Sequence, residues 1–243
     1  MPYFRGKQLQ MENLEYVYRD PFLTAINKPH GLLVHRSSIA ADTNIYAVQL
    51  VRNSLGVRVF PVHRLDRKTA GVLLFALNAE TNSLMQQMFM NHQVGKKYHA
   101  IVRGFTPDSG VIDYPLKNET GNLQEAITNY KTLKRTELPI PSGRFSSSRY
   151  SLVEITPETG RMHQIRRHFA HIFHPVIGDR PHGCNKQNRL FLVRFSHNDL
   201  LLHATQLRFL HPITNNEVII TASYQPSFSR MIHLLGFDQQ TSP

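Results

Sequence analysis

The chain has a single cysteine, Cys184, in 243 residues and so cannot form an internal disulfide. This excludes a disulfide-stapled secreted scaffold and favours a reducing compartment. Its longest uninterrupted apolar run, residues 71–77, is far shorter than the roughly 18–20 residues that a membrane span needs. The first ten residues also lack the apolar stretch of a secretory signal. We therefore expect a cytoplasmic protein that does not enter membranes.

Acidic residues are also scarce. The chain has 17 Asp and Glu against 28 Lys and Arg, which gives a formal net charge of +11. Such an excess favours a polyanionic partner, nucleic acid before a membrane surface. No repeat of fixed period is visible, so solenoid and propeller folds are set aside. The sequence shows no apolar helix seam of the kind that forms an obligate oligomer, so we expect a monomer.

Apolar runs and turn signals alternate along the chain in a pattern that predicts an α+β fold. Helices are predicted at 78–93, with Asn78 as the N-cap, and at 161–173. Residues 107–149 are richer in Pro, Gly, Ser and Lys, and we expect them to form a surface excursion with strands on either side. Strands are predicted at 16–26 with a break at Asp20, and at 57–62, 71–77, 98–103, 151–155, 200–210 and 217–222.

The first candidate for chemistry is Asp66, on the short connection between two predicted buried strands. Arg64, Arg67 and Lys68 surround it, and these three cations favour an ionised carboxylate that can act as a nucleophile or a base. The alternative is a turn aspartate bonded to its own backbone, with Thr69 as a local cap, because Asp is a preferred turn residue.

The second candidate is Arg166, on the predicted helix 161–173. At about 100° per residue, it falls within the apolar stripe of that helix. A guanidinium there must be paired, because an unpaired buried charge is costly. Asp66 is the best candidate partner that the sequence offers, whereas Arg166 at the edge of the stripe could instead extend its charged end to solvent.

Tyr98 follows Lys96 and Lys97 at the start of a predicted strand. An aromatic face beside cations that can reach phosphates can stack on an unpaired base. A half-buried strand tyrosine is the alternative interpretation.

The histidines near the second helix do not form a metal motif. His163, His168, His171 and His174 point in widely spread directions, and Cys184 alone cannot complete a zinc ligand set. No Walker loop or dinucleotide fingerprint is present either. The sequence therefore predicts neither a metal nor a cofactor.

Several blocks of the sequence resemble one enzyme family. The run from His63 to Asp66, followed by Thr69 and Gly71, resembles the catalytic motif of the RluA-type pseudouridine synthases. Ala70 stands where the family usually has Ser. Four further blocks occur in the family's order, and the match covers residues 13–223. These blocks are Asn27-Lys28-Pro29 with Gly31 and His35, then Lys97-Tyr98, then the run from Thr159 to His168, and finally Leu202-His203-Ala204.

The resemblance implies a mixed, mainly antiparallel β-sheet catalytic domain with flanking helices and a central RNA-binding cleft. This single domain would cover residues 13–243, after an N-terminal extension of residues 1–12 and without an S4 RNA-binding domain. The implied reaction isomerises uridine to pseudouridine without cofactor or metal. The bond from C1′ to N1 breaks, the uracil turns, and C5 joins C1′.

The resemblance also implies roles for the candidate residues. Asp66 would be the catalytic carboxylate, attacking the sugar or removing a sugar proton, and Arg166 would pair with it. Tyr98 would stack on the uracil, and Arg64 would fill the gap left by the flipped base. The remaining family positions would contact the substrate, at Lys97 and Leu202, or support the cleft, at Asn27, Lys28 and His35.

Within the family, residues 139–150, 158–179 and 182–189 most resemble the bacterial enzymes that modify uridine 65 of tRNA, in the T-stem region. The expected partner is therefore RNA, most simply tRNA. An rRNA substrate, a non-catalytic RNA-binding protein and a metal-dependent RNA hydrolase remain as alternatives.

Overall fold

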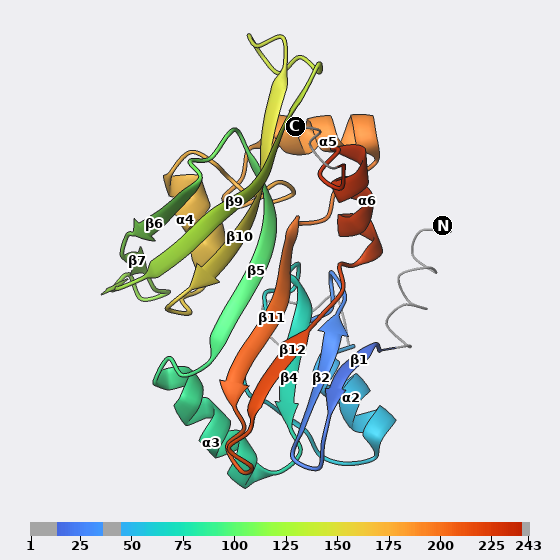
Figure 1. Ribbon diagram of the computed structural model, residues 1–243, viewed down its shortest axis with the longest axis vertical. Coiled ribbons are helices and arrows are strands. Elements are labelled where there is room, and N and C mark those ends of the chain that lie inside the picture. The colour runs from blue at the N-terminus through green and yellow to red at the C-terminus, as the bar shows by residue number, and fades with distance from the viewer. Residues whose placement is uncertain (1–13, 36–44, 240–243) are drawn as a thin grey trace. The chain divides into compact units, whose positions relative to one another are not determined.

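The structure is a computed structural model that describes residues 14–35 and 45–239 (Figure 1). These residues form two compact units. The first unit combines the described residues up to Gly95 with Ala204–Ser223, and the second combines Lys96–His203 with the described residues from Tyr224 onward. The expected extension at residues 1–12 lies outside the described residues, and the single catalytic domain over 13–243 stays a prediction.

The first unit is built on an antiparallel sheet. β1 pairs with β2, both β2 and β3 pair with β4, and β12 pairs with β11. Every residue of β2 and β4 is buried, as predicted for the apolar run 71–77 from its lack of a polar face. The strands are β1 (Tyr16–Arg19), β2 (Leu23–Lys28), β3 (Phe60–Pro61), β4 (Ala70–Ala76), β11 (Leu202–Leu210), which enters this unit at Ala204, and β12 (Glu217–Thr221).

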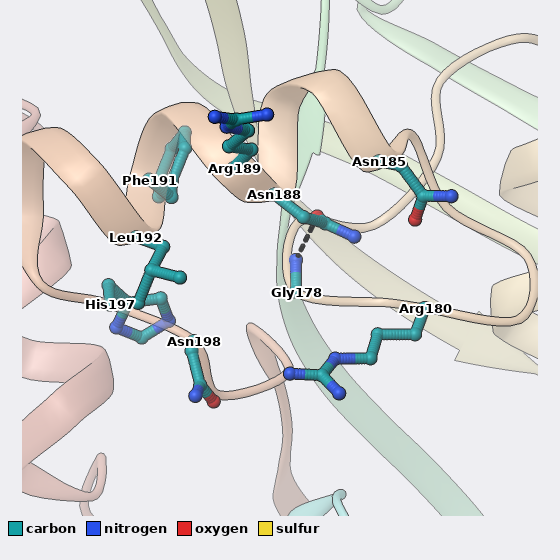
Figure 2. A pocket seen from close by; sticks show the side chains of 9 residues that line it. All are labelled: Gly178, Arg180, Asn185, Asn188, Arg189, Phe191, Leu192, His197 and Asn198. Carbon is teal, nitrogen blue, oxygen red and sulfur yellow. Dashed lines mark hydrogen bonds between the residues drawn. The ribbon is translucent and has the colours of Figure 1, made fainter.

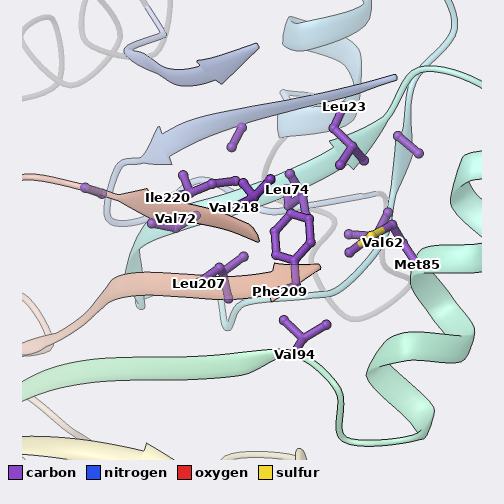
Figure 3. Close-up of a cluster of buried hydrophobic side chains, with 13 residues drawn as sticks. Leu23, Val62, Val72, Leu74, Met85, Val94, Leu207, Phe209, Val218 and Ile220 are labelled. Atoms are coloured by element: carbon purple, nitrogen blue, oxygen red, sulfur yellow. The ribbon is translucent and has the colours of Figure 1, made fainter. Parts of the chain in front are cut away.

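Helices α2 (Ala47–Leu55) and α3 (Ala79–Met90) complete the first unit. The Asn78 side chain accepts a hydrogen bond from the Thr81 N–H at 2.8 Å, which confirms the predicted N-cap of α3. Figure 3 shows the core of this unit, where Met85 of α3 lies among side chains of β2, β4, β11 and β12. Helix α2 was not predicted from the sequence.

The predicted strand at 57–62 is wrong for most of its length. Helix α2 ends at Gly56, which adopts a left-handed conformation with φ 70°. Val57 is then 48% exposed, and only the two residues of β3 pair with β4. The left-handed turn that ends α2 is followed by residues 57–59, which the apolar pattern assigned to the strand but which lie outside it.

In the second unit the strands pair antiparallel in the order β5-β10-β9-β6. β9 and β10 run side by side as a long hairpin (Figure 1). A separate two-stranded sheet is formed by β7 and β8. The strands are β5 (Gly95–Arg103), β6 (Ser109–Asp113), β7 (Leu116–Lys117), β8 (Leu123–Gln124), β9 (Ile127–Leu138) and β10 (Ser148–Pro157).

The expectation of a surface excursion at 107–149 is therefore wrong, because this segment supplies β6 and β9 to the sheet. Its polar composition has a physical reason. β9 alternates between more and less buried residues over most of its length, so one of its faces tolerates polar and charged residues. The stretch between β9 and β10 and the short connections around β7 and β8 lack regular strand structure.

Three helices lie in the second unit: α4 (Gln164–His171), α5 (Asn185–Phe195) and α6 (Pro226–Leu234). Helix α4 is shorter than predicted, because His163 and Phe173 adopt left-handed conformations with φ of 54° and 64°. Helices α5 and α6 were not predicted. Phe191 and Phe228 place them on one core cluster, which also contains Tyr150 of β10.

The α+β class and the mainly antiparallel pairing with flanking helices are as predicted. None of the helices in the described part of the chain is long and apolar enough to cross a membrane.

Candidate functional site

In the first unit, residues 62–69 connect β3 to β4 and carry the motif around Asp66. Leu65 is 7% exposed and anchors the loop in the core, whereas Asp66 is half-buried and Arg64 is exposed. The Thr69 N–H donates a hydrogen bond to the Asp66 carbonyl oxygen at 3.0 Å. Main-chain atoms thus close the turn that presents the carboxylate.

The block that begins at Asn27 lies against this loop. The Gly31 N–H donates to the Arg67 carbonyl at 2.8 Å, and the Arg67 Nε donates to the Gly31 carbonyl at 3.1 Å. The His30 ring nitrogen Nδ1 lies 2.7 Å from the Lys68 carbonyl oxygen. Two sequence blocks that are 30 to 40 residues apart therefore form one rigid clamp on the main chain beside Asp66.

Lys28 lies fully buried beneath the clamp. Its ammonium group donates to the carbonyls of Pro29 at 3.0 Å, Leu32 at 2.9 Å and Arg67 at 3.2 Å. Burial lowers the pKa of Lys28 to about 7, while the negative charge of Asp66 acts in the opposite direction. Lys28 is thus the internal support of the loop and interacts electrostatically with the candidate carboxylate.

The other residues expected to support the cleft are placed differently. The Asn27 side chain donates to Glu15 Oε2 and to the Ser223 carbonyl, both at 2.9 Å, and holds β2 to its neighbours. His35 is exposed and lies at the end of a described segment. Its role stays a prediction.

Close packing fixes the far end of the loop. Gly71 has a φ of 109°, and a Cβ there would lie 2.1 Å from the Ala204 carbonyl oxygen. Only glycine allows β4 to approach β11 so closely at this point. The His63 side chain also connects the loop to β4 and α3. Its Nε2 accepts a hydrogen bond from the Leu74 N–H at 3.1 Å, and its ring stacks on Phe89.

In the second unit, Tyr98 lies on β5 opposite Ile155 of β10. It is half-buried and packs on the core cluster that contains Leu202, a residue 3% exposed. Lys97 pairs with Glu154, with 3.2 Å between Nζ and Oε2. The half-buried position of Tyr98 fits both of its interpretations.

Arg166 of α4 is buried, with 5% of its surface exposed, so the predicted burial is confirmed and the solvent-extended alternative is wrong. Its Nε and Nη2 donate to the two carboxylate oxygens of Asp179, each at 2.8 Å. This bidentate pair is the strongest geometry that an arginine and a carboxylate can form. The pairing of Arg166 with Asp66 stays a prediction.

Asp179 is the functional candidate that sequence reasoning missed. Burial alone would raise the pKa of Asp179, but hydrogen bonds and charge from Arg166 lower it overall. Its Oδ1 also accepts from the His182 N–H at 3.3 Å. A signal was available, because Asp179 lies two residues after the apolar pair Val176 and Ile177 in a chain with few acidic residues.

The block from Thr159 onward forms the scaffold that holds α4. Buried Gln164 donates to the Ile127 carbonyl at 3.0 Å and to Thr128 Oγ1 at 2.9 Å. Its Oε1 accepts from the Thr159 hydroxyl at 2.7 Å and from the Arg161 N–H at 3.0 Å. One amide side chain thus ties the start of α4 to β9.

The histidines around α4 serve structural contacts. His168 is fully buried between Thr128 Oγ1 and the Tyr114 carbonyl, at 2.9 and 3.0 Å. His163 Nδ1 lies 3.0 Å from His182 Nε2. Within residues 14–35 and 45–239, no three His, Cys, Asp or Glu side chains are grouped to hold a metal ion.

The sequence model of a family described as RNA pseudouridylate synthase matches residues 23–171. The chain is 44% identical to tRNA pseudouridine synthase C of Vibrio parahaemolyticus, over 93% of this chain and 97% of the relative. It is 43% identical to the protein of that name in Salmonella typhimurium, over 92% and 90%. Among solved structures, the human protein titled RNA Pseudouridylate Synthase Domain Containing 4 aligns with a TM-score of 0.72 and 26% identity, covering 96% of this chain and 98% of its own.

Proposed function

The chain belongs to the RNA pseudouridylate synthase family, and on that basis we propose that it isomerises a uridine of tRNA to pseudouridine. The observation that carries the proposal is its similarity to proteins named tRNA pseudouridine synthase C over nearly their whole length. The net charge of +11 supports an RNA substrate. We further propose uridine 65, in the T-stem region, as the target.

Asp66 is proposed as the catalytic carboxylate. The reaction conserves all atoms of the nucleotide: the C1′–N1 bond breaks, the uracil rotates, C5 bonds to C1′, and the proton lost from C5 is balanced by one gained at N1. Asp66 begins the reaction by attacking C1′ or by removing a proton from the sugar. The loop suits this role because main-chain contacts hold it and leave the carboxylate half-buried.

The substrate residues follow the same proposal. Tyr98 stacks on the uracil, and the exposed Arg64 occupies the gap that the base leaves in the helix. Base extrusion costs a few kcal/mol, which contacts of Lys and Arg with phosphates offset. Arg166, Lys97 and Leu202 contact the substrate or the catalytic carboxylate. We propose that the protein acts as a monomer in the cytoplasm.

Tritium release from tRNA labelled at uridine C5 tests the reaction directly. The wild-type protein, Asp66→Asn and the control Asp108→Asn are compared in the presence of EDTA. Asp108 is a suitable control because its side chain is 92% exposed and lies in the other unit. We expect release by the wild type and the control, and at least about a 1,000-fold lower rate for Asp66→Asn.

Mapping the modified nucleotide then identifies the target uridine. Release from rRNA fragments but not from tRNA would contradict the tRNA proposal. Equal rates for Asp66→Asn and the wild type would contradict the catalytic role of Asp66. Loss of RNA binding in step with activity would also contradict it, because a catalytic group contributes to the chemical step more than to binding.

A further inference from the structure

A pocket of about 200 Å³ lies under α5 in the second unit (Figure 2). Figure 2 shows the guanidinium groups of Arg180 and Arg189 on opposite sides of that helix, so the pocket does not bring their charges together on one ligand. A set of polar and charged side chains does meet elsewhere in this unit. It consists of Lys97 and His99 of β5, Glu154 of β10, and Tyr224, which lies before α6.

Strand pairing places three of these side chains on one face. His99 and Glu154 lie directly opposite each other in the antiparallel pair of β5 and β10. Lys97 lies two residues before His99, and side chains two residues apart in a strand point to the same face. Tyr98, between them, points to the other face. The carboxylate of Glu154 therefore lies beside two basic groups of one strand.

The Glu154 carboxylate is shared between these two groups. Its Oε2 lies 3.2 Å from Lys97 Nζ and 3.7 Å from His99 Nε2. The Lys97 side chain is 45% exposed, whereas that of His99 is 19% exposed. An ion pair of a half-exposed lysine is weak, so a phosphate that approaches Lys97 can replace Glu154 as its partner at little cost. Glu154 is then left with the imidazole of His99.

Tyr224 holds the other nitrogen of this imidazole, because its hydroxyl is hydrogen-bonded to His99 Nδ1. Burial and the negative charge of Glu154 raise the pKa of Tyr224 to about 12, so the phenol keeps its proton at neutral pH. Neutral His99 accepts from the phenol at Nδ1 and carries its own hydrogen on Nε2, toward Glu154. An added proton goes to Nδ1, where the phenol oxygen accepts it. Both protonation states of His99 therefore keep their partners.

The charges around His99 act on it in opposite directions. Burial lowers the pKa of His99, Glu154 raises it, and Lys97 lowers it. From β11, the titratable group that faces this set is fully buried His203, whose ring lies edge-on to Tyr224 with 5.6 Å between the centroids. When Lys97 moves away from Glu154, its lowering influence on His99 is removed and that of the carboxylate stays. His99 then binds a proton more readily.

We propose that RNA binding transfers Glu154 from Lys97 to His99, and that His99 takes up one proton from the buffer in the same step. An RNA phosphate binds the Lys97 ammonium group, and the imidazolium replaces the lysine as the partner of the carboxylate. The proposal rests on the proposed function, because it takes Lys97 as a contact of the RNA substrate. It adds a form of regulation: affinity for RNA decreases as pH rises through the range in which His99 titrates.

An NMR titration of the histidines in the free protein tests the sharing of Glu154 without RNA. In Lys97→Met the carboxylate faces His99 alone, so we expect a higher pKa for His99 than in the wild type. His233 is the internal reference, because it also faces a carboxylate, that of Asp238 at 2.7 Å, but is 77% exposed and lies on α6. Its titration should not change. An equal pKa of His99 in the two proteins would overturn the proposal.

Calorimetric titration with tRNA near pH 6.5, in buffers of different ionisation enthalpy, counts the protons taken up on binding. The wild type should take up as much as one proton more than His99→Gln and Lys97→Met, and the control His233→Gln should match the wild type. Between about pH 5.5 and 7.5 the Kd of the wild type should rise more steeply than that of His99→Gln, by up to about tenfold for each pH unit.

Equal proton uptake by the wild type and His99→Gln would overturn the proposal, even in a protein that releases tritium from tRNA. Uptake that depends on both His99 and Lys97, in a protein that binds tRNA but releases no tritium, would contradict the proposed function and leave the proton linkage standing.

Discussion

In the first unit the Asp66 loop is held mainly at its own main-chain atoms, whereas in the second unit Arg166 is held by side-chain atoms. The loop is fixed by carbonyls and N–H groups of Gly31, Arg67 and Thr69, with Lys28 beneath it. Arg166 is fixed by the carboxylate of Asp179.

The two arrangements have different sensitivities. A loop held by its main chain tolerates changes of exposed side chains but depends on the few positions where the backbone packs closely. A buried ion pair depends on both side chains, because removal of one leaves an uncompensated charge. The following predictions test this contrast, from the largest expected effect to the smallest.

Gly71→Ala should be the most damaging single change in the first unit. The new Cβ would meet the Ala204 carbonyl at 2.1 Å, and the φ of 109° is strained for any L side chain. We expect the free energy of unfolding to fall by at least about 5 kcal/mol, or the variant to fail to fold. Urea denaturation measures this. Gly160→Ala is the control, because no atom lies within 4 Å of a Cβ there; similar losses for both variants would refute the close-packing argument.

Asp179→Asn should lower the free energy of unfolding by about 3–5 kcal/mol, because it removes the negative charge of a buried bidentate ion pair. Asp108→Asn removes the partner of an exposed pair, and should leave stability unchanged. The double variant Arg166→Met/Asp179→Leu should regain most of the lost stability but not the activity. If that variant recovers tritium release as well, Arg166 acts only through the fold.

Lys28→Met should lower the free energy of unfolding by about 3 kcal/mol, since the carbonyls of Pro29, Leu32 and Arg67 lose the hydrogen bond from the ammonium group. The same change should reduce kcat more than it changes KM for tRNA, because the loop that carries Asp66 loses its support. Arg52→Met removes an exposed cation from α2 and serves as the control. Unchanged kcat in a folded Lys28→Met protein would show that the clamp alone positions the loop.

The same lysine should also contribute to the pH dependence of stability, with an effect that is smaller for each pH unit. The pKa of Lys28 is about 7 in the folded protein against 10.5 ordinarily, so between these values the unfolded chain binds more protons. This contribution makes the free energy of unfolding rise with pH from about 7 to 10.5, by up to about 1.4 kcal/mol per pH unit. Below pH 7 the contribution of Lys28 to the free energy of unfolding is constant. The stability difference between the wild type and Lys28→Met should therefore widen from pH 7 to 9.5 in urea titrations; a constant difference would contradict it.

The sequence predicted elements whose signals are local. The N-cap at Asn78 and the buried strand β4 each depend on neighbouring residues. The burial of Arg166 was also predictable, because a helix turns by a fixed angle per residue.

The rest depends on contacts that are distant in sequence. No residue near Lys28 in the sequence indicates that its ammonium group donates a hydrogen bond to the Arg67 carbonyl, 39 residues away. Asp179 was not connected with Arg166 because the two residues are 13 positions apart and the fold brings them together. The polar strand β9 was misjudged because a strand with one exposed face can have the composition of a loop.

The order in which the chain passes between the two units governs how it folds during synthesis. Leu207 and Phe209 of β11 belong to the hydrophobic core of the first unit. Phe228 and Met231 of α6 belong to a hydrophobic core of the second unit. A ribosome that has made 200 residues therefore carries two incomplete cores. Both become complete when the last fifth of the chain emerges, so nascent chains expose apolar surface until late and should depend on chaperones more than a protein whose domains form one after the other.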